Sequence, residues 1–122
     1  MLEHEDLTER IIGAAIEVHR KLGPGFLESI YQAALAIELR KRGVNFQLQV
    51  PVPILYDQEK IGEHRLDLFV ENEIVVELKS VRSFEDIHFR LVKSYLNAAH
   101  RKHGLLLNFA ATTLQIKRVI AP

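Results

Sequence analysis

Apolar and polar residues alternate along two neighbouring runs between Gly62 and Val81, which is the pattern of two β-strands that each bury one face. A short polar stretch, Glu71 to Glu73, separates the runs and predicts a hairpin turn. With a turn of that length, apolar residues meet in cross-strand pairs, which are Val70 with Ile74, Leu68 with Val76 and Leu66 with Leu78. We therefore expect a hairpin whose apolar residues all lie on one face.

The opposite face of the same hairpin carries charge. Asp67 lies across from Glu77 in this register, and directly opposed like charges destabilise a strand pair. Lys79 follows Glu77 on the same face and would offset the repulsion. A bound divalent cation is the alternative, because hard cations such as Mg²⁺ take carboxylate oxygens as ligands. The pattern predicts an acidic pair that needs a compensating positive charge, and it leaves open which cation provides it.

A helical spacing of apolar residues precedes the strands. The first helix is expected to begin at a capping pair, Asp6 with Glu9, and to run to about Lys21. The sequence Gly23-Pro24-Gly25 should end it, since glycine supplies a left-handed terminator and proline prevents continuation.

The second helix is predicted from Phe26 to Arg42, and Gly43 should end it. Its inner side is expected to hold the following apolar residues: Leu27, Ile30, Tyr31, Ala34, Ile37 and either Ala33 or Leu35. After the hairpin, Ser83 is the expected cap of a third helix that extends towards Gly104.

The remaining apolar stretches predict strands. Phe46 to Ile54 alternates with two prolines on one parity, and because proline cannot donate a ladder hydrogen bond, this strand should lie at a sheet edge or be irregular there. Leu105 to Phe109 is continuously apolar, as in a strand covered on both faces, although a short buried helix would read the same. Leu114 to Ile120 reads as a last strand. The order of elements predicts one small α/β domain, residues 1–122, with a mixed sheet flanked by helices.

Composition narrows the class of protein. The chain has 122 residues and contains no cysteine, which excludes disulfides, thiolate catalysis and thiolate-bound zinc. Sixteen acidic residues balance sixteen basic ones, so any affinity for nucleic acid must come from local patches. The start, Met1 to Arg10, has no apolar signal-peptide core, and no run is long enough to span a membrane. We expect a cytoplasmic protein.

The charged face of the hairpin holds the groups that phosphodiester hydrolysis needs, which are metal ligands and a positive charge near the attacking water. In that arrangement Asp67 and Glu77 would bind Mg²⁺, with Mn²⁺ as a substitute, and the backbone carbonyl of Leu78 could add a ligand. Lys79 would position or deprotonate the water. The same residues on an exposed strand are also compatible with ordinary surface polarity, so the triplet alone does not decide between the two interpretations.

Several motifs, in order along the chain, carry a family resemblance. Gly25 to Tyr31 reads G-x-x-E-x-x-Y, and I-I-G-A-A-I-E-V-H, Q-V-P-V-P-I, R-L-D-L-F-V and I-V-V-E-L-K-S-V accompany it. From Leu7 to about Ile120 the chain resembles the GxxExxY protein family of the PD-(D/E)XK nuclease-like superfamily. The resemblance implies a restriction-endonuclease-like fold, catalytic roles for Asp67, Glu77 and Lys79, and a further acidic site residue in Glu28, which is also a candidate metal ligand.

One position departs from the related proteins, which commonly carry a glutamine four residues before a tyrosine in the third helix. Tyr95 is present here, but Leu91 stands at the glutamine position. His88, Tyr95 and Tyr31 remain further candidate site residues. The expected function is a Mg²⁺-dependent nuclease acting on nucleic acid, DNA in preference to RNA, and a homodimer is compatible with it. The alternative is a weak or inactive module of the same fold that binds nucleic acid or a protein partner.

Overall fold

A computed structural model describes residues 4–122, and Met1 to Glu3 of the polar start lie outside the described part. The elements follow the predicted order, with α1 (Glu5–Leu22) and α2 (Glu28–Lys41) before β1 (Phe46–Tyr56), β2 (Glu59–Val70) and β3 (Ile74–Lys79). The chain continues with α3 (Asp86–Ala99), β4 (His103–Asn108) and β5 (Gln115–Ile120). Among the described residues, no helix is long and apolar enough to cross a membrane.

The strands form one mixed sheet in the order β1-β2-β3-β4-β5. Only β3 and β4 run parallel, because α3 connects them, and the other neighbours are antiparallel. The predicted hairpin register is confirmed where β2 pairs with β3, since Val70 faces Ile74 and Leu68 faces Val76. The proline-containing β1 lies at a sheet edge, as predicted. The apolar run Leu105 to Phe109 supplies most of β4, an inner strand whose residues enter the cores on both faces of the sheet, and not a buried helix.

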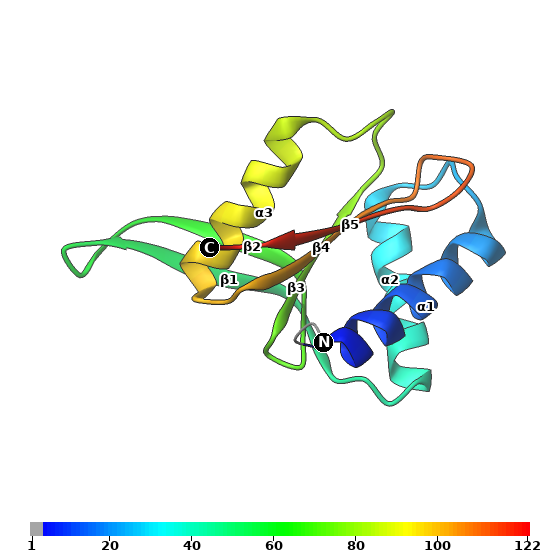
Figure 1. The fold of residues 1–122 in the computed structure, drawn as a ribbon, viewed down its shortest axis with the longest axis horizontal. Coiled ribbons are helices and arrows are strands. Elements are labelled where there is room, and N and C mark those ends of the chain that lie inside the picture. The colour runs from blue at the N-terminus through cyan, green and yellow to red at the C-terminus, as the bar shows by residue number, and fades with distance from the viewer. Residues whose placement is uncertain (1–3) are drawn as a thin grey trace.

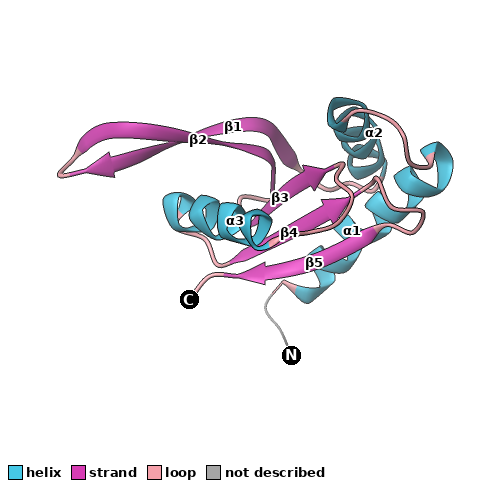
Figure 2. Cartoon of the chain, turned by 90° about the horizontal axis from the view of Figure 1, so that it is seen from above, coloured by secondary structure: helices cyan, strands magenta, loops and turns pink. Residues whose placement is uncertain are grey.

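Helices cover both faces of the sheet (Figures 1 and 2). The helices α1 and α2 pack on one face through a core that includes Ile11, Tyr31 and Leu78. The helix α3 packs on the other face through a second core that includes Val75, Leu96 and Leu106. The architecture is therefore α/β with a mixed sheet between two helical layers.

The inner face of α2 differs from the prediction. Tyr31 and Leu35 are buried as predicted, Leu35 being the correct one of the two alternatives. Leu27, Ile30 and Ile37 are exposed, whereas Leu39, which was not predicted, is buried. The prediction was wrong because α2 carries apolar residues around most of its circumference, so the periodicity could not distinguish the face that packs on the sheet from the face that meets solvent.

Both predicted helix caps were also wrong. The helix α1 begins one residue before Asp6, and its N-cap is His4, which makes no side-chain capping bond. Glu85, not Ser83, caps α3, because its side chain accepts from the backbone of His88 while His88 Nδ1 accepts the Glu85 N–H at 2.9 Å. This reciprocal arrangement provides acceptors for two main-chain N–H groups, whereas a single serine cap would provide an acceptor for one.

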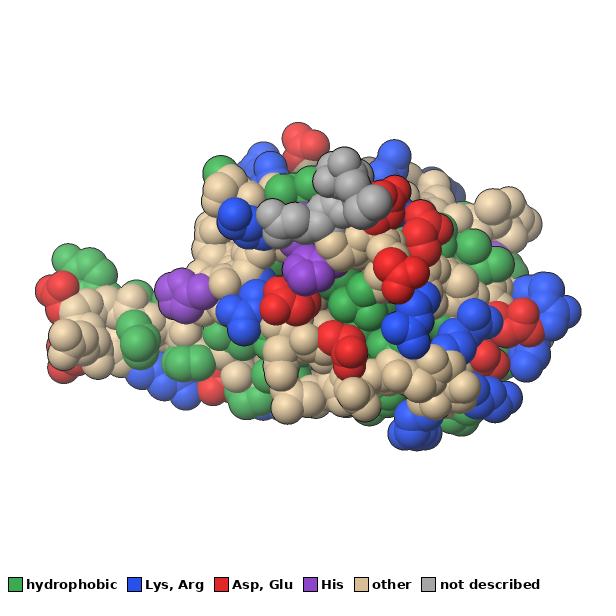
Figure 3. Space-filling model, turned by 60° about the horizontal axis from the view of Figure 1, so that its bottom comes forward, with side chains coloured by type: hydrophobic (Ala, Val, Ile, Leu, Met, Phe, Trp, Pro, Cys, Tyr) green, Lys and Arg blue, Asp and Glu red, His purple; other side chains and the backbone are tan. Residues whose placement is uncertain are grey.

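The paired strands β1 and β2 extend beyond the sheet as a twisted two-stranded arm, which projects from the body of the molecule (Figure 3). The pairing of β2 with β3 ends at Leu68, and from there β2 continues with β1 alone. The predicted pair of Leu66 with Leu78 therefore does not form. Leu66 packs in the core under α3 while Leu68 packs in the core under α1 and α2, because the strong twist of a two-stranded ribbon turns the apolar side of β2 from one core to the other.

Candidate active site

Asp67 lies where β2 leaves β3. The antiparallel ladder between β2 and β3 ends at Leu68, the neighbour of Asp67. The main chain of β3 beyond that pair therefore needs another hydrogen-bond acceptor. The Asp67 carboxylate provides it, because Oδ2 accepts the N–H of Leu78 at 2.9 Å. The separation of the strands thus fixes an acidic side chain at the fork between the arm and the sheet.

Glu77 is the buried member of the acidic pair. Only 4% of the residue is exposed, and its Oε1 has no hydrogen-bond partner. Burial, together with the charge of Asp67 and a hydrogen bond with it, raises the pKa of Glu77 to about 8, while Lys79 opposes the rise. The acidic residues predicted from the hairpin register are therefore brought together, although their main chains are not paired as cross-strand partners.

Lys79 and Tyr95 lie next to this pair. The ammonium Nζ of Lys79 is 3.5 Å from Glu77 Oε2, and its side chain is 21% exposed. Tyr95 comes from α3, and its burial and the negative charges of Glu77 and Asp67 raise the pKa of its hydroxyl to about 12. The phenol therefore stays neutral near the carboxylates and keeps its proton for hydrogen bonding.

Glu28 reaches the same region from the first turn of α2. Its Oε2 accepts the N–H of Ser80 at 3.1 Å, which ties the start of α2 to the end of β3. An open pocket of about 450 Å³ lies in front of it, lined by Glu28, Ser29, Gln32, Gln49, Asp67 and Leu78. The structure thus places Glu28 and Asp67 on one pocket, with Glu77 adjoining Asp67 on its buried side.

Two further candidates, Tyr31 and His88, make structural contacts elsewhere. The hydroxyl of Tyr31 donates to the carbonyl of Gly23 at 2.6 Å and accepts the N–H of Phe26, while its ring stacks on Phe109 at 4.5 Å. His88 belongs to the cap of α3. Neither residue lines the pocket at Asp67. Leu91 packs, partly buried, against the core under α3.

Gln32 and Gln49 are pocket residues to which the sequence analysis gave no site role, although Gln49 opens the Q-V-P-V-P-I motif. The amide Nε2 of Gln49 lies 2.6 Å from Gln32 Oε1 and 3.4 Å from Asp67 Oδ1. Glutamines on a helix and on an edge strand have no spacing that marks them as a pair. Only the tertiary contact between α2 and the arm brings them together.

The donor set fits a hard divalent cation. Asp67 and Glu77 supply carboxylate oxygens, and the partnerless, buried Glu77 Oε1 is an acceptor to which a cation could bind. Within the part of the chain that the structure describes, no group of three or more histidine, aspartate or glutamate side chains is arranged to hold a metal. A cation at this site would therefore rely on two carboxylates, with main-chain or water oxygens completing its shell, as Mg²⁺ commonly does.

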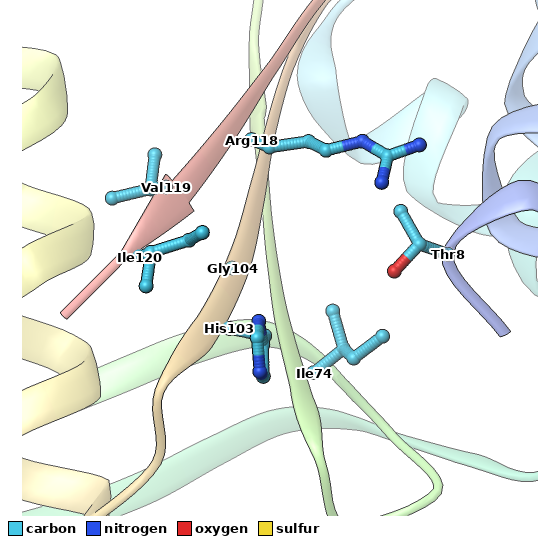
Figure 4. A pocket seen from close by; sticks show the side chains of 7 residues that line it. All are labelled: Thr8, Ile74, His103, Gly104, Arg118, Val119 and Ile120. Atoms are coloured by element: carbon cyan, nitrogen blue, oxygen red, sulfur yellow. The ribbon is translucent and has the colours of Figure 1, made fainter. Parts of the chain in front are cut away.

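A separate hollow lies at the other end of the strands, between α1 and the sheet (Figure 4). It is lined by Thr8, Ile74, His103, Gly104, Arg118, Val119 and Ile120, and its volume is only about 20 Å³. That volume holds roughly one water molecule. Since it contains no carboxylate and is small, the pocket at Asp67 remains the candidate active site.

Comparisons with known proteins agree with this fold. The family model for the PD-(D/E)XK nuclease superfamily matches residues 5–119. The crystal structure of SSO0001 has a similar fold, with a TM-score of 0.62 at 17% sequence identity. The match covers 98% of this chain and 60% of that chain, so this chain spans less than two thirds of SSO0001. No curated protein matches the sequence. Because the family model covers nearly the whole chain, the chain belongs to the PD-(D/E)XK nuclease superfamily.

Proposed function

We propose that this protein is a divalent-metal-dependent nuclease that hydrolyses phosphodiester bonds in nucleic acid, DNA in preference to RNA. The observation that supports this function best is the buried acidic pair, Asp67 with Glu77, beside the ammonium of Lys79. Burial of one carboxyl next to another is costly, and a structural role alone would be served better by apolar residues of similar size. Membership of a nuclease superfamily agrees with the same chemistry.

In this proposal Asp67 and Glu77 hold the cation, Mg²⁺ or Mn²⁺, and the carbonyl of Leu78, the residue after Glu77, adds a main-chain oxygen. The bound cation would polarise a phosphate oxygen and lower the pKa of a water molecule. Glu28 lines the same pocket and is a further candidate ligand. The hydrogen bond from Leu78 N–H keeps the Asp67 carboxylate oriented towards the fork before any ligand arrives.

Lys79 acts on the water and on the phosphate. Its ammonium is a donor with no acceptor capacity, and in the structure it contacts Glu77 Oε2. With a cation held by the acidic pair, the Lys79 ammonium would be free of that contact and could donate to a phosphate oxygen or to the attacking water. Positive charge at that point stabilises the negative charge that develops during phosphodiester cleavage.

A plasmid-nicking assay with Mg²⁺ and Mn²⁺, run beside single-stranded DNA and RNA substrates, tests the function. Lys79→Ala should reduce cleavage by at least about 100-fold, the usual scale for a residue that serves proton transfer or charge stabilisation. Its affinity for Mn²⁺ in calorimetry should stay within a few-fold of wild type, because lysine serves the water rather than the ion.

Lys102→Ala is the matched control, since Lys102 is exposed and precedes β4 at the end of the strand remote from the site. It should cleave like wild type. Wild-type cleavage by Lys79→Ala would contradict the proposed mechanism. Binding of nucleic acid by the wild-type protein without any metal-dependent cleavage would favour the alternative function, a binding module of nuclease fold.

A further inference from the structure

Gln49 has a left-handed backbone in the middle of an edge strand. Its φ is 51°, although every residue around it in β1 is extended and it is not a glycine. A residue with a Cβ pays a conformational cost in this region. Strain of this kind persists where surrounding contacts require it.

The strand pairing gives no reason for that conformation. Leu48 pairs with Leu68 and Val50 pairs with Leu66, so the register is the same on both sides of Gln49 and no extra residue is accommodated. The position skipped by the ladder on β2 is Asp67. The main chain therefore departs from regular pairing opposite the acidic residue of the candidate site.

The side chain of Gln49 uses the space that this departure provides. Its amide Nε2 donates to Gln32 Oε1 at 2.6 Å and lies 3.4 Å from Asp67 Oδ1. The guanidinium of Arg65 donates to the main-chain carbonyl of Gln49 at 3.2 Å. One amide thus joins α2 to β2 across the pocket. A regular extended residue would direct its side chain differently, because the direction of a side chain follows its φ and ψ.

We propose that Gln49 is a positioning residue for Asp67, an inference that rests on the proposed function. The amide of Gln49 holds Asp67 Oδ1 from the β1 side, and the N–H of Leu78 holds Oδ2 from the β3 side. A carboxylate fixed by two donors keeps further lone pairs for a cation. Gln32 in turn accepts from Gln49 and orients its amide. The left-handed backbone is the conformation that places the amide between these partners.

Two substitutions separate the amide from the backbone. Gln49→Gly removes the amide and relieves the left-handed strain, whereas Gln49→Ala removes the amide and keeps the strain. Both should weaken Mn²⁺ binding in calorimetry by about tenfold, the lower end of the usual loss when a hydrogen-bond partner of a metal ligand is removed. Without metal, Gln49→Gly should melt at a higher temperature than Gln49→Ala. Gln32→Ala should show a smaller loss of Mn²⁺ affinity, because Asp67 keeps its direct donor.

Gln47→Ala is the matched control, since Gln47 is an exposed glutamine on the same strand that does not line this pocket. It should bind Mn²⁺ like wild type. Wild-type Mn²⁺ affinity in both Gln49 variants would overturn the positioning role. Failure of the wild-type protein itself to bind Mn²⁺ at millimolar concentration would instead overturn the proposed function, so the two failures are distinguishable.

Discussion

Burial and the neighbouring Asp67 raise the pKa of the Glu77 carboxyl from 4.5 to about 8, so without a bound cation this carboxyl keeps its proton to a higher pH than an exposed glutamate does. At a pH between these two pKa values, the folded state therefore still binds a proton at Glu77 that the unfolded chain has already released. Stability then decreases as the pH rises through that interval. Below it, both states are protonated at this position, and the full stability contribution is present.

Glu77→Gln tests this protonation. In the metal-free wild type, the free energy of unfolding should fall between about pH 4.5 and about pH 8 by a few kcal/mol more than in the variant, since one pKa unit corresponds to about 1.4 kcal/mol. Urea denaturation at several pH values measures the difference. Added Mn²⁺ should flatten the wild-type slope and leave the variant unchanged. Parallel pH profiles of the two proteins would show that Glu77 has an ordinary pKa.

Individual site residues were predictable from the sequence to different degrees. Asp67, Glu77 and Lys79 could be proposed because polarity alternates along the hairpin and places their residue types on one side. Gln49 could not, because its role depends on a backbone angle that no residue pattern indicates. The same holds for the hydrogen bond from Leu78 to Asp67, which exists only because a ladder ends there.

Among the elements, β3 and β4 do most to hold the site in place. Asn108, at the end of β4, is fully buried and its amide bonds both main-chain groups of Val81, donating at 2.8 Å and accepting at 3.0 Å. It also donates to Gln115 and accepts from Ala110. These bonds secure the segment that follows Lys79. In the same segment, the N–H of Ser80 donates to the Glu28 carboxylate.

Asn108→Ala should therefore destabilise the protein and loosen the segment after β3. A fully buried main-chain group left without a partner costs about 1–3 kcal/mol, and the groups of the half-buried Val81 should cost less than this each. Chemical denaturation measures the loss, and hydrogen exchange at Ser80 and Val81 should become faster. Gln115→Ala, which removes one of these bonds at an exposed position, serves as the control and should cost less. Equal costs for both variants would mean that Asn108 does not secure this segment.

At the level of elements, local patterns predicted pairing well and long-range packing less well. The turn length determined the register of β2 with β3, because a change of one residue would invert both faces. The separation of the strands after Leu68 and the inner face of α2 depend on the twist of the sheet and on competition between apolar surfaces. Neither quantity is encoded in the spacing of residues along one element.

For the whole molecule, the order of elements and the mixed sheet followed from periodicity, whereas the charge distribution needed the structure. The net charge is +0, and many basic side chains are engaged in ion pairs, among them Arg118 with Glu9 and Lys41 with Glu38. Arg82, in contrast, is exposed in the segment between Lys79 and α3. We expect it to contact phosphate.

Affinity for DNA, measured by fluorescence anisotropy, should accordingly fall steeply as salt rises. Arg82→Ala should reduce the slope of log affinity against log salt by about 0.9, the loss of one phosphate contact on duplex DNA. Lys102→Ala should leave the slope unchanged. Binding that does not respond to salt would contradict an electrostatic contact with nucleic acid and would point to a protein partner.

The prolines of β1 have a consequence for solubility. An arm that projects from a sheet offers a long free edge, which is a template for pairing with other chains and a start for aggregation. Pro51 and Pro53 lie within the ladder with β2, opposite Arg65 and Glu63, so their nitrogens must face away from β2. The outer edge of the arm therefore lacks two of the N–H groups that a further strand would need. The same residues that mark β1 as an edge strand keep the arm from recruiting a neighbour by backbone pairing.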